Sequence, residues 1–405
     1  MDEVEGAPTR TQIVLFQLGA LALCVALLWW LYEGPAGFGR WFDPVCKLLA
    51  CDYRRHFHPT IADLAGSGLP GVGWFYPPTL AVLTWPFLGQ LDVDTAVGVW
   101  TACQALLMGV WCILPPHLAG RSEAPVAVGF TVATALSIPV LQVLKWGQLS
   151  TALALLVLAA FLALDRGRST RGGALLGLAV ALKVYPVLLL VWPAVRRDVR
   201  ALVAAAVTTL VLALLLPMLV LGPAGLMAFY GGVQAGMDEA QGWMRMSPGS
   251  HFVPTVVARW WGHEALRERL LQPSALLAVG ALPLLAAIRR QRTHDAALWA
   301  FAVAGGIFPF LVASSWLHYF AYLPVGWLVL ARELPRLAPV HRAGVGTLLG
   351  ASVLFASLIW HQVLYGADAR AYAEAAWLLW SDLLVLAGVA WTLVVTRGAD
   401  AATPR

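Results

Sequence analysis

The sequence predicts an all-α integral membrane protein with about ten spans, and three observations support this. Of the 405 residues, 60% are hydrophobic and 12% are charged, whereas a soluble chain carries about a quarter charged residues. Apolar runs recur with the length of about 20 residues that a helix needs to cross a bilayer. The gaps between these runs are too short for a separate soluble domain, so we expect residues 1–405 to form a single integral membrane domain.

The first apolar run predicts a helix that is retained rather than a signal peptide that is cleaved. Asp2, Glu3 and Glu5 make the segment before it acidic. The run Ile13–Tyr32 also exceeds the core of about 7–15 residues that signal peptides have. It belongs to the first of the ten spans that we expect, which are 12–32, 96–114, 125–143, 149–164, 201–221, 274–289, 296–313, 316–331, 343–361 and 377–396.

Arginine clusters between the apolar runs predict the topology. They lie at 166–171, 196–200, 289–292, 332–342 and 397–405, and the positive-inside rule places all five in the cytoplasm. Both termini are then cytoplasmic too. The formal net charge of +5 reflects topology rather than a binding surface, and no nucleic-acid partner is expected.

Two apolar segments do not fit a simple span. Residues 76–90 are short and begin with a proline pair, and counting them as a span would move every later arginine cluster outside. We therefore expect an external interfacial helix there. Residues 172–195 have arginines at both ends and contain Lys183 and Pro186. A broken, re-entrant helix pair fits this pattern, because protein can bury such backbone inside a membrane.

The topology leaves two long external segments, the first loop 33–95 and the later segment 222–273. Cys46 and Cys51 both lie in the first loop. If that stretch were helical, their spacing would turn them about 140° apart, which is poor geometry for a disulfide. A bridge between them therefore requires an irregular loop.

The first loop concentrates acids and bases, which indicates chemistry on a lipid-linked substrate at the membrane surface. Glycosyl transfer from such a substrate needs a carboxylate that takes the proton of the acceptor hydroxyl. It also needs cations that stabilise the departing phosphate. Asp43 is our first candidate for the base, although Asp43 before Pro44 is also a good helix N-cap. Asp52 and Asp63 are interpreted as solvated loop acids.

The tripeptide Asp92-Val93-Asp94 has the DxD pattern by which many soluble sugar transferases hold a metal and a diphosphate. Here it directly precedes a span, where Asp94 would cap the helix, and tripeptide motifs occur often by chance. His56 and His58 lack an evident third ligand. We therefore predict no metal and no other cofactor.

The chain has three lysines among its 27 basic residues, and none lies in an arginine cluster. Lys47 is in the first loop, Lys145 lies with Gln148 in an external turn, and Lys183 lies in the broken segment. An intramembrane cation is costly unless it has a partner, so a structural pair and phosphate binding explain Lys183 equally well. A contact to phosphate or sugar fits Lys145 better.

Several motifs follow one another along most of the chain. After the first loop with Asp43, they are Tyr76-Pro77-Pro78, Gly147-Gln148, the run 177–186 and Ser315-Trp316-Leu317-His318. In this order they resemble the polyprenol-phosphate-mannose-dependent α-mannosyltransferases of glycosyltransferase family 87, in the GT-C superfamily. The resemblance implies a GT-C fold and an inverting, metal-independent transfer on the periplasmic face, with Asp43 as the catalytic acid residue. Pro44 follows Asp43 where the family commonly has an aromatic or aliphatic residue and then tyrosine, so Asp52 stays open as the base.

We therefore expect a glycosyltransferase of a bacterial plasma membrane that moves a hexose, mannose by the resemblance, from a polyprenyl-phosphate donor to a lipid, glycan or protein acceptor. The alternative is a transporter or flippase for lipid-linked sugars. Such a protein would carry ionisable residues in several mid-membrane spans, whereas this chain has essentially only Lys183 there. The residues expected to bind the donor phosphate or sugar are Lys47, Arg54, Arg55, Tyr76, Lys145, Gln148, Lys183, Arg245, His251 and His318.

Overall fold

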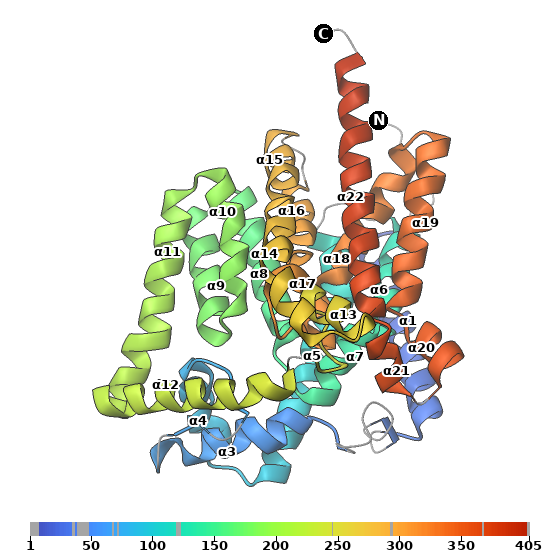
Figure 1. Cartoon of the computed structure of the whole chain (residues 1–405). Coiled ribbons are helices and arrows are strands. Elements are labelled where there is room, and N and C mark those ends of the chain that lie inside the picture. The colour runs from blue at the N-terminus through green and yellow to red at the C-terminus, as the bar shows by residue number, and fades with distance from the viewer. Residues whose placement is uncertain are drawn as a thin grey trace.

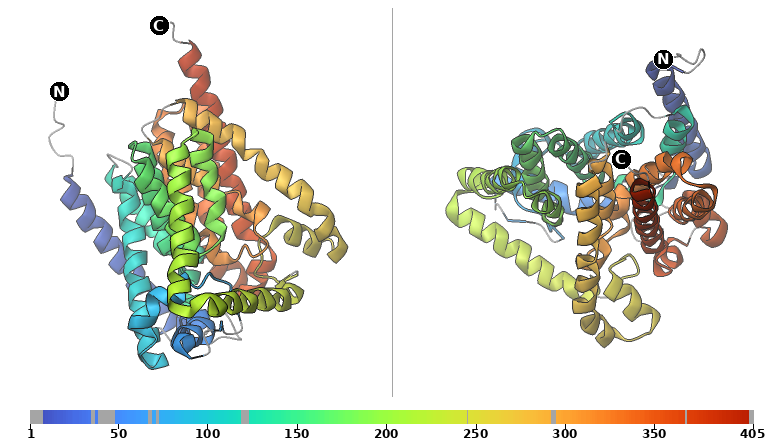
Figure 2. Two further views of the ribbon diagram at one scale, coloured as in Figure 1. Left: turned by 90° about the vertical axis from the view of Figure 1, so that its left-hand side faces the viewer. Right: turned by 90° about the horizontal axis from the view of Figure 1, so that it is seen from above.

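The computed structural model describes residues 8–34, 37–38, 48–66, 69–70, 73–118, 123–244, 246–291, 295–366 and 368–402. Every regular element in these ranges is a helix, as the sequence predicts. Most of the helices stand side by side, and a layer of helices lies across one end of the bundle (Figure 1). The beginning of the first helix and the end of the last lie at the opposite end (Figure 2). We call these the loop end and the terminal end.

Within the described ranges, five helical segments are long and apolar enough to cross a membrane. They make the chain a polytopic membrane protein. The other apolar helices are shorter, so the number of about ten spans stays a prediction. The five segments are α1 (Arg10–Tyr32), α5 (Val93–Leu118), Val199–Ala240, Glu264–Arg290 and Ala369–Thr396.

The helices other than α1 and α5, including those that make up the three longer segments, follow in chain order. They are η1 (Tyr53–Phe57), α3 (His58–Ala62), η2 (Asp63–Ala65), α4 (Thr79–Leu88), α6 (Ala124–Ala135), α7 (Ile138–Trp146), α8 (Ser150–Asp165), α9 (Ser169–Leu182), η3 (Tyr185–Leu190), α10 (Val191–Arg196), α11 (Val199–Leu210), η4 (Val211–Leu215), α12 (Leu216–Met244), α13 (Val253–Trp260), α14 (Glu264–Val279), α15 (Ala281–Gln291), α16 (Ala296–Gly305), α17 (Phe308–Leu311), η5 (Leu317–Tyr322), α18 (Leu323–Glu333), η6 (Leu334–Arg336), α19 (Pro339–Phe355), α20 (Leu358–Tyr365), α21 (Ala369–Glu374) and α22 (Trp377–Ala402).

The third and ninth predicted spans are each broken in the middle, and their breaks face each other. The third is α6 followed by α7, and the ninth is α19 followed by α20. The amide of Ile138 donates to the carbonyl oxygen of Ala356 (2.8 Å), and the amide of Leu358 donates to that of Leu136 (2.8 Å). The two breaks thus satisfy backbone groups that would be costly to leave unpaired inside a membrane.

The segment predicted to be re-entrant is a helical hairpin whose two ends lie together at the terminal end. Between α9 and η3 the backbone of Lys183 is extended (φ −156°, ψ 132°), and α10 then returns. The two ends meet where Ser169 Oγ donates to Asp198 Oδ2 (2.7 Å). α9 packs closely on α11 because Gly173 has no side chain, since a Cβ there would lie 2.1 Å from the carbonyl oxygen of Ala201.

The long helical segment Val199–Ala240 changes direction at the loop end. Gly222 has φ 71° and ψ 167°, a conformation readily open only to glycine. After it, α12 lies across the loop end instead of continuing upright (Figure 1). α4 packs against α12 and has ten residues, too few to span a membrane, in line with the predicted interfacial helix.

The later external segment, predicted as residues 222–273, ends earlier than expected. The helix that follows it, α14, begins at Glu264, whereas the sequence predicted that this span begins near residue 274.

Ion pairs gather at the terminal end. Arg196 pairs with Asp165 (3.3 Å), and Arg332 pairs with Asp295 (3.0 Å). Arg289 donates to a backbone carbonyl of α10 (2.6 Å). These arginines belong to three of the predicted cytoplasmic clusters, and they share one end of the bundle. Which side of the membrane that end faces stays a prediction.

Candidate active site

The candidate site lies at the loop end and begins with an irregular turn in the first loop. Ala50 has φ 50°, which is unusual for a residue with a side chain. Cys51 is disulfide-bonded, and the other half of the bridge lies outside the described residues. The sequence allowed a bridge only if the loop is irregular, and the turn at Ala50 meets that condition. Asp52 follows directly, and it is half-buried.

The side-chain amide of Gln148 connects Asp52 to a buried cation. Gln148 Nε2 donates to Asp52 Oδ2 (2.5 Å), and Gln148 Oε1 accepts from the hydroxyl of Tyr76 (2.5 Å). Lys183 Nζ donates to the same Oε1 (3.1 Å) and to the Tyr76 hydroxyl oxygen (3.0 Å). Only one orientation of the amide satisfies all of these partners, because a carboxylate accepts and an ammonium donates.

Short, constrained backbone brings these side chains together. Gln148 follows Gly147, which has φ 69°, in the turn between α7 and α8. A Cβ at Gly147 would lie 2.9 Å from Tyr53 Cβ, so only glycine lets η1 approach this closely. The carbonyl oxygen of Gly147 accepts from Trp100 Nε1 (2.8 Å). The turn is thereby fixed to both η1 and α5.

Three tyrosine rings enclose the ammonium of Lys183, and we call Lys183 with these three residues the lysine cage. The distances from Nζ to the ring centroids are 4.5 Å for Tyr319, 4.7 Å for Tyr76 and 5.5 Å for Tyr185. Tyr185 and Tyr319 stack on each other with centroids 4.6 Å apart. Cation–π contact of this kind favours a charged ammonium.

Lys183 is 6% exposed, and no described carboxylate lies within ion-pair distance of it. Burying a charge without an opposite charge is expensive, and polar atoms of Tyr76 and Gln148 compensate only in part. The lysine cage is therefore a place where an anionic ligand would be stabilised.

Burial also shifts the pKa values of two first-loop residues in this group, Asp52 and Tyr76. It raises the pKa of Asp52 above the usual range of an aspartate, while His56, the hydrogen bond from Gln148 and Lys183 oppose this rise. Burial raises the pKa of Tyr76 well above that of a free phenol, so the hydroxyl stays protonated and donates to Gln148.

Two predicted histidines are buried near this end. His318 is on η5, its ring lies 4.8 Å from that of Tyr319, and its Nε2 has no hydrogen-bond partner among the described residues. His251 is fully buried and its Nδ1 lies 3.1 Å from the carbonyl oxygen of Gly249. Burial lowers the pKa of His251 to about 3, so this ring is neutral. The structure brings His318, but not His251, into contact with the lysine cage.

Three other predicted donor-binding residues have different surroundings. Arg54 pairs with Asp94 (2.7 Å), and Arg55 is exposed. Lys145 is fully buried and its Nζ donates to the carbonyl oxygen of Leu48 (3.0 Å). Lys145 therefore supports the turn that precedes Asp52.

The DxD tripeptide has a structural use. Asp92 Oδ1 accepts from the amides of Asp94 and Thr95, both at 3.1 Å, so Asp92 caps α5. The sequence assigned the cap to Asp94, and that assignment is wrong because Asp94 instead pairs with Arg54. Among the described residues, no group of three or more His, Cys, Asp or Glu side chains could hold a metal ion.

The predicted residues Asp43, Lys47 and Arg245 lie outside the described residues. Sequence reasoning did not select Tyr185, which completes the lysine cage. The available signal was its position two residues after Lys183, on the far side of the break between α9 and η3.

The fold and the site together define a class of protein. This is a helical membrane protein in which a carboxylate, an amide, a phenol and a buried cation form one connected group at one end, an arrangement suited to group transfer on an anionic substrate.

The comparison with protein families names that class more closely. The model of glycosyltransferase family 87 matches residues 74–315, which is more than half of the chain. The chain therefore belongs to glycosyltransferase family 87 and is a membrane glycosyltransferase, and the predicted GT-C placement is consistent with this. The match includes Tyr76, Gln148 and Lys183 and begins after Asp43 and Asp52. Among curated proteins, no sequence matches this chain.

Proposed function

We propose that this glycosyltransferase moves a hexose, mannose on the strength of the resemblance, from a polyprenyl-phosphate donor to a lipid, glycan or protein acceptor. The transfer inverts the anomeric centre and uses no metal or other cofactor. It takes place on the external face of a bacterial plasma membrane, and the terminal end faces the cytoplasm.

The observation that carries the proposal is the buried ammonium of Lys183. No described carboxylate lies within ion-pair distance of it, and the phosphate of a lipid-linked donor would supply a directly contacting negative charge. His318 adds a ring nitrogen beside Tyr319 that has no hydrogen-bond partner in the part of the chain that the structure describes. A cation placed where negative charge develops is the usual way to stabilise a leaving phosphate.

Apolar side chains next to the lysine cage support a donor with a lipid tail. Val184 is 58% exposed and Val187 is 43% exposed, although both are apolar. Phe87 on α4 is 74% exposed, and α4 packs against α9. We propose that the polyprenyl chain lies along this side, between α4 and the neighbouring spans.

Two carboxylates of the first loop are proposed for the base. The resemblance assigns the role to Asp43, which lies outside the described residues. The geometry favours Asp52, because Gln148 connects it to Lys183. Gln148 bonds Asp52 through Oδ2, which leaves Oδ1 for the acceptor hydroxyl.

The proposed step transfers one proton and exchanges one bond. The carboxylate takes the hydroxyl proton of the acceptor, while the acceptor oxygen bonds to the anomeric carbon of the hexose. The bond between that carbon and the phosphate oxygen breaks, and its electron pair leaves with the polyprenyl phosphate. Lys183 and His318 stabilise the charge that develops on the departing oxygen.

A transfer assay tests this proposal. Purified wild type, Asp43→Asn and Asp52→Asn would be incubated with radiolabelled synthetic polyprenyl-phosphate-mannose and a membrane lipid extract, in parallel without and with EDTA. We expect transfer by the wild type and a loss of about 10²-fold or more in the variant that lacks the base. Asp63→Asn is the matched control, since Asp63 is an exposed acid of the same loop and should keep the wild-type rate.

Each other result overturns a stated part of the proposal. No transfer by the wild type removes polyprenyl-phosphate-mannose as donor. Loss of transfer on addition of EDTA removes the metal-independent mechanism. Equal rates in Asp43→Asn, Asp52→Asn and wild type remove both carboxylates as the base.

A further inference from the structure

We infer that Arg259, on α13, is a positioning residue that holds His318 and Tyr319 against Lys183. The inference rests on the proposed function, in which the lysine cage binds the donor phosphate. Arg259 does not touch the cage itself. It acts through two intermediate segments, residues 247–251 and residues 313–316, the segment directly before η5.

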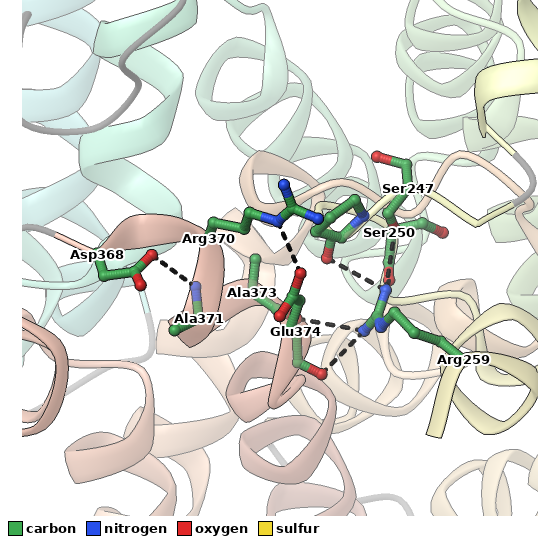
Figure 3. A network of polar contacts seen from close by, with 9 residues as sticks. Ser247, Ser250, Arg259, Asp368, Arg370, Ala371, Ala373 and Glu374 are labelled. Carbon is green, nitrogen blue, oxygen red and sulfur yellow. Dashed lines mark hydrogen bonds and ion pairs between the residues drawn. The ribbon is translucent and has the colours of Figure 1, made fainter. Parts of the chain in front are cut away.

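The first step is the set of contacts that Arg259 makes. Its Nη1 donates to the backbone carbonyl oxygens of Ser247 (2.9 Å), Pro248 (3.3 Å) and Ser250 (3.3 Å). Its Nη2 donates to those of Ala373 (3.3 Å) and Glu374 (3.1 Å) on α21. Figure 3 shows the guanidinium between the two segments. The fork of a guanidinium matches this two-sided geometry, which a single ammonium cannot.

The second step joins residues 247–251 to the segment before η5. The amide of His251 donates to the carbonyl oxygen of Ser315 (2.8 Å), and Ser250 Oγ donates to that of Ala313 (3.2 Å). Gly249 lies directly against the ring of Trp316, since a Cβ there would lie 2.8 Å from the ring. The position of residues 247–251 therefore sets the position of Ser315 and Trp316.

The third step runs from Trp316 into the lysine cage. The carbonyl oxygen of Trp316 accepts from the amide of Tyr319 (2.8 Å), and Ser314 Oγ lies 3.4 Å from the Tyr319 hydroxyl. The Tyr319 ring lies 4.5 Å from Lys183 Nζ, and His318 packs on that ring. A shift of the segment before η5 therefore moves both rings relative to Lys183.

Hydrogen exchange tests the structural half of the inference without any substrate. Wild type, Arg259→Ala and Arg259→Lys would be compared by mass spectrometry, with Arg370→Ala as control. Arg370 belongs to the same network, but among the described residues its side chain hydrogen-bonds only to Glu374, in an exposed ion pair (2.7 Å). We expect faster exchange of residues 314–322 in Arg259→Ala, an intermediate effect in Arg259→Lys and none in Arg370→Ala.

Binding of undecaprenyl phosphate, the probe for the donor's lipid phosphate, tests the functional half. We expect Arg259→Ala to raise the Kd about tenfold, Arg259→Lys to recover part of this loss, and Arg370→Ala to bind as the wild type does. The kcat at saturating donor should fall less than kcat/KM, because Arg259 is remote from the reacting atoms.

The outcomes separate this inference from the proposed function. If exchange of residues 314–322 is unchanged in Arg259→Ala, or if its Kd for the probe is that of the wild type, the positioning role is overturned. If the wild type does not bind undecaprenyl phosphate while exchange behaves as expected, the donor of the proposed function is wrong and so is the role of Arg259 toward it. Equal changes in exchange and in Kd in Arg259→Ala and Arg370→Ala would show only a general loss of stability, and they would also overturn the positioning role.

Discussion

The carboxylate of Asp52 and the ammonium of Lys183 are joined through a single side chain. Gln148 donates to Asp52 (2.5 Å) and accepts from Lys183 (3.1 Å), although the three residues come from the first loop, the turn between α7 and α8, and the break after α9. The connection relates a candidate base to a candidate phosphate site. It also means that the two groups do not act independently.

Replacing Gln148 tests this connection. Gln148→Ala removes one hydrogen bond from the Asp52 carboxylate and one from the Lys183 ammonium, and a hydrogen bond to a charged group contributes about 1.5–3 kcal/mol. We expect kcat/KM for the donor to fall by about 10- to 100-fold. Gln234→Ala, on the exposed side of α12, should leave kcat/KM unchanged. A Gln148→Ala rate equal to that of the wild type would show that the link has no catalytic use.

The pH dependence of transfer should report Asp52. Burial raises its pKa, so the fraction of carboxylate, and with it the rate of a reaction that needs a base, should rise with pH through a value above the usual aspartate range. Lys183→Met removes a positive charge that opposes the rise and should move this limb to still higher pH. A pH–rate profile at saturating donor measures both effects. If the apparent pKa of the rising limb is the same in Lys183→Met as in the wild type, the electrostatic interaction between Asp52 and Lys183 is contradicted.

The same shift predicts the opposite trend in stability. A carboxyl whose pKa is raised in the folded state contributes stability that is fully present below its unfolded pKa and is lost as pH rises through the folded pKa. Between these two values, wild type should therefore lose stability relative to Asp52→Asn as pH rises. Thermal unfolding in detergent at several pH values measures this difference, and a constant difference would exclude a raised pKa.

The sequence allowed the helical membrane fold to be predicted because apolar runs and arginine clusters are local patterns. It also located the break at Lys183, since a charge and Pro186 interrupt an apolar run. The pairing of two broken helices through Ile138 and Leu358 could not be predicted, because no local pattern tells which breaks will face each other. For the same reason, Gln148 was selected as a donor contact, while its bond to Asp52 in another segment was not foreseen.

The disulfide next to Asp52 should make transfer sensitive to reductant. Cys51 is disulfide-bonded, and it fixes the backbone one residue before the carboxylate. We expect a reducing agent to lower the transfer rate of the wild type several-fold, and Cys51→Ser to be slow with or without the reductant. Cys103→Ser is the control because Cys103 is a free, exposed thiol, and it should behave as the wild type. A Cys51→Ser rate equal to that of the wild type would contradict the prediction.

Gly147 should tolerate no side chain. Gly147→Ala combines an unfavourable positive φ with a contact of 2.9 Å to Tyr53 Cβ. We expect a loss of stability of about 1–3 kcal/mol from strain, together with loss of activity because Gln148 is the next residue. Gly167→Ala isolates the backbone effect, since Gly167 has φ 72° but open space around it. Thermal unfolding of both variants measures the difference, and equal losses would show that the contact with Tyr53 adds nothing.

Asp382 and Tyr322 form a buried hydrogen-bonded pair. We expect the loss of either side chain alone to destabilise the protein more than the loss of both together would suggest. Asp382 on α22 is fully buried, its Oδ1 accepts from the Tyr322 hydroxyl (3.1 Å), and its Oδ2 has no hydrogen-bond partner among the described residues. Removing one partner leaves the other buried and unsatisfied, which costs about 1–3 kcal/mol, whereas replacing both by apolar groups is nearly neutral.

Asp382→Leu and Tyr322→Phe should therefore each destabilise the protein, and the double variant should be more stable than the sum of the two losses implies. Thermal unfolding of the four proteins closes this cycle. The transfer rate adds a second reading, because Tyr322 ends the helix that carries His318 and Tyr319. If the double variant recovers stability but not activity, the hydrogen bond between Asp382 and Tyr322 holds η5 in the position that the lysine cage requires. Additive losses would instead show that the two side chains contribute independently.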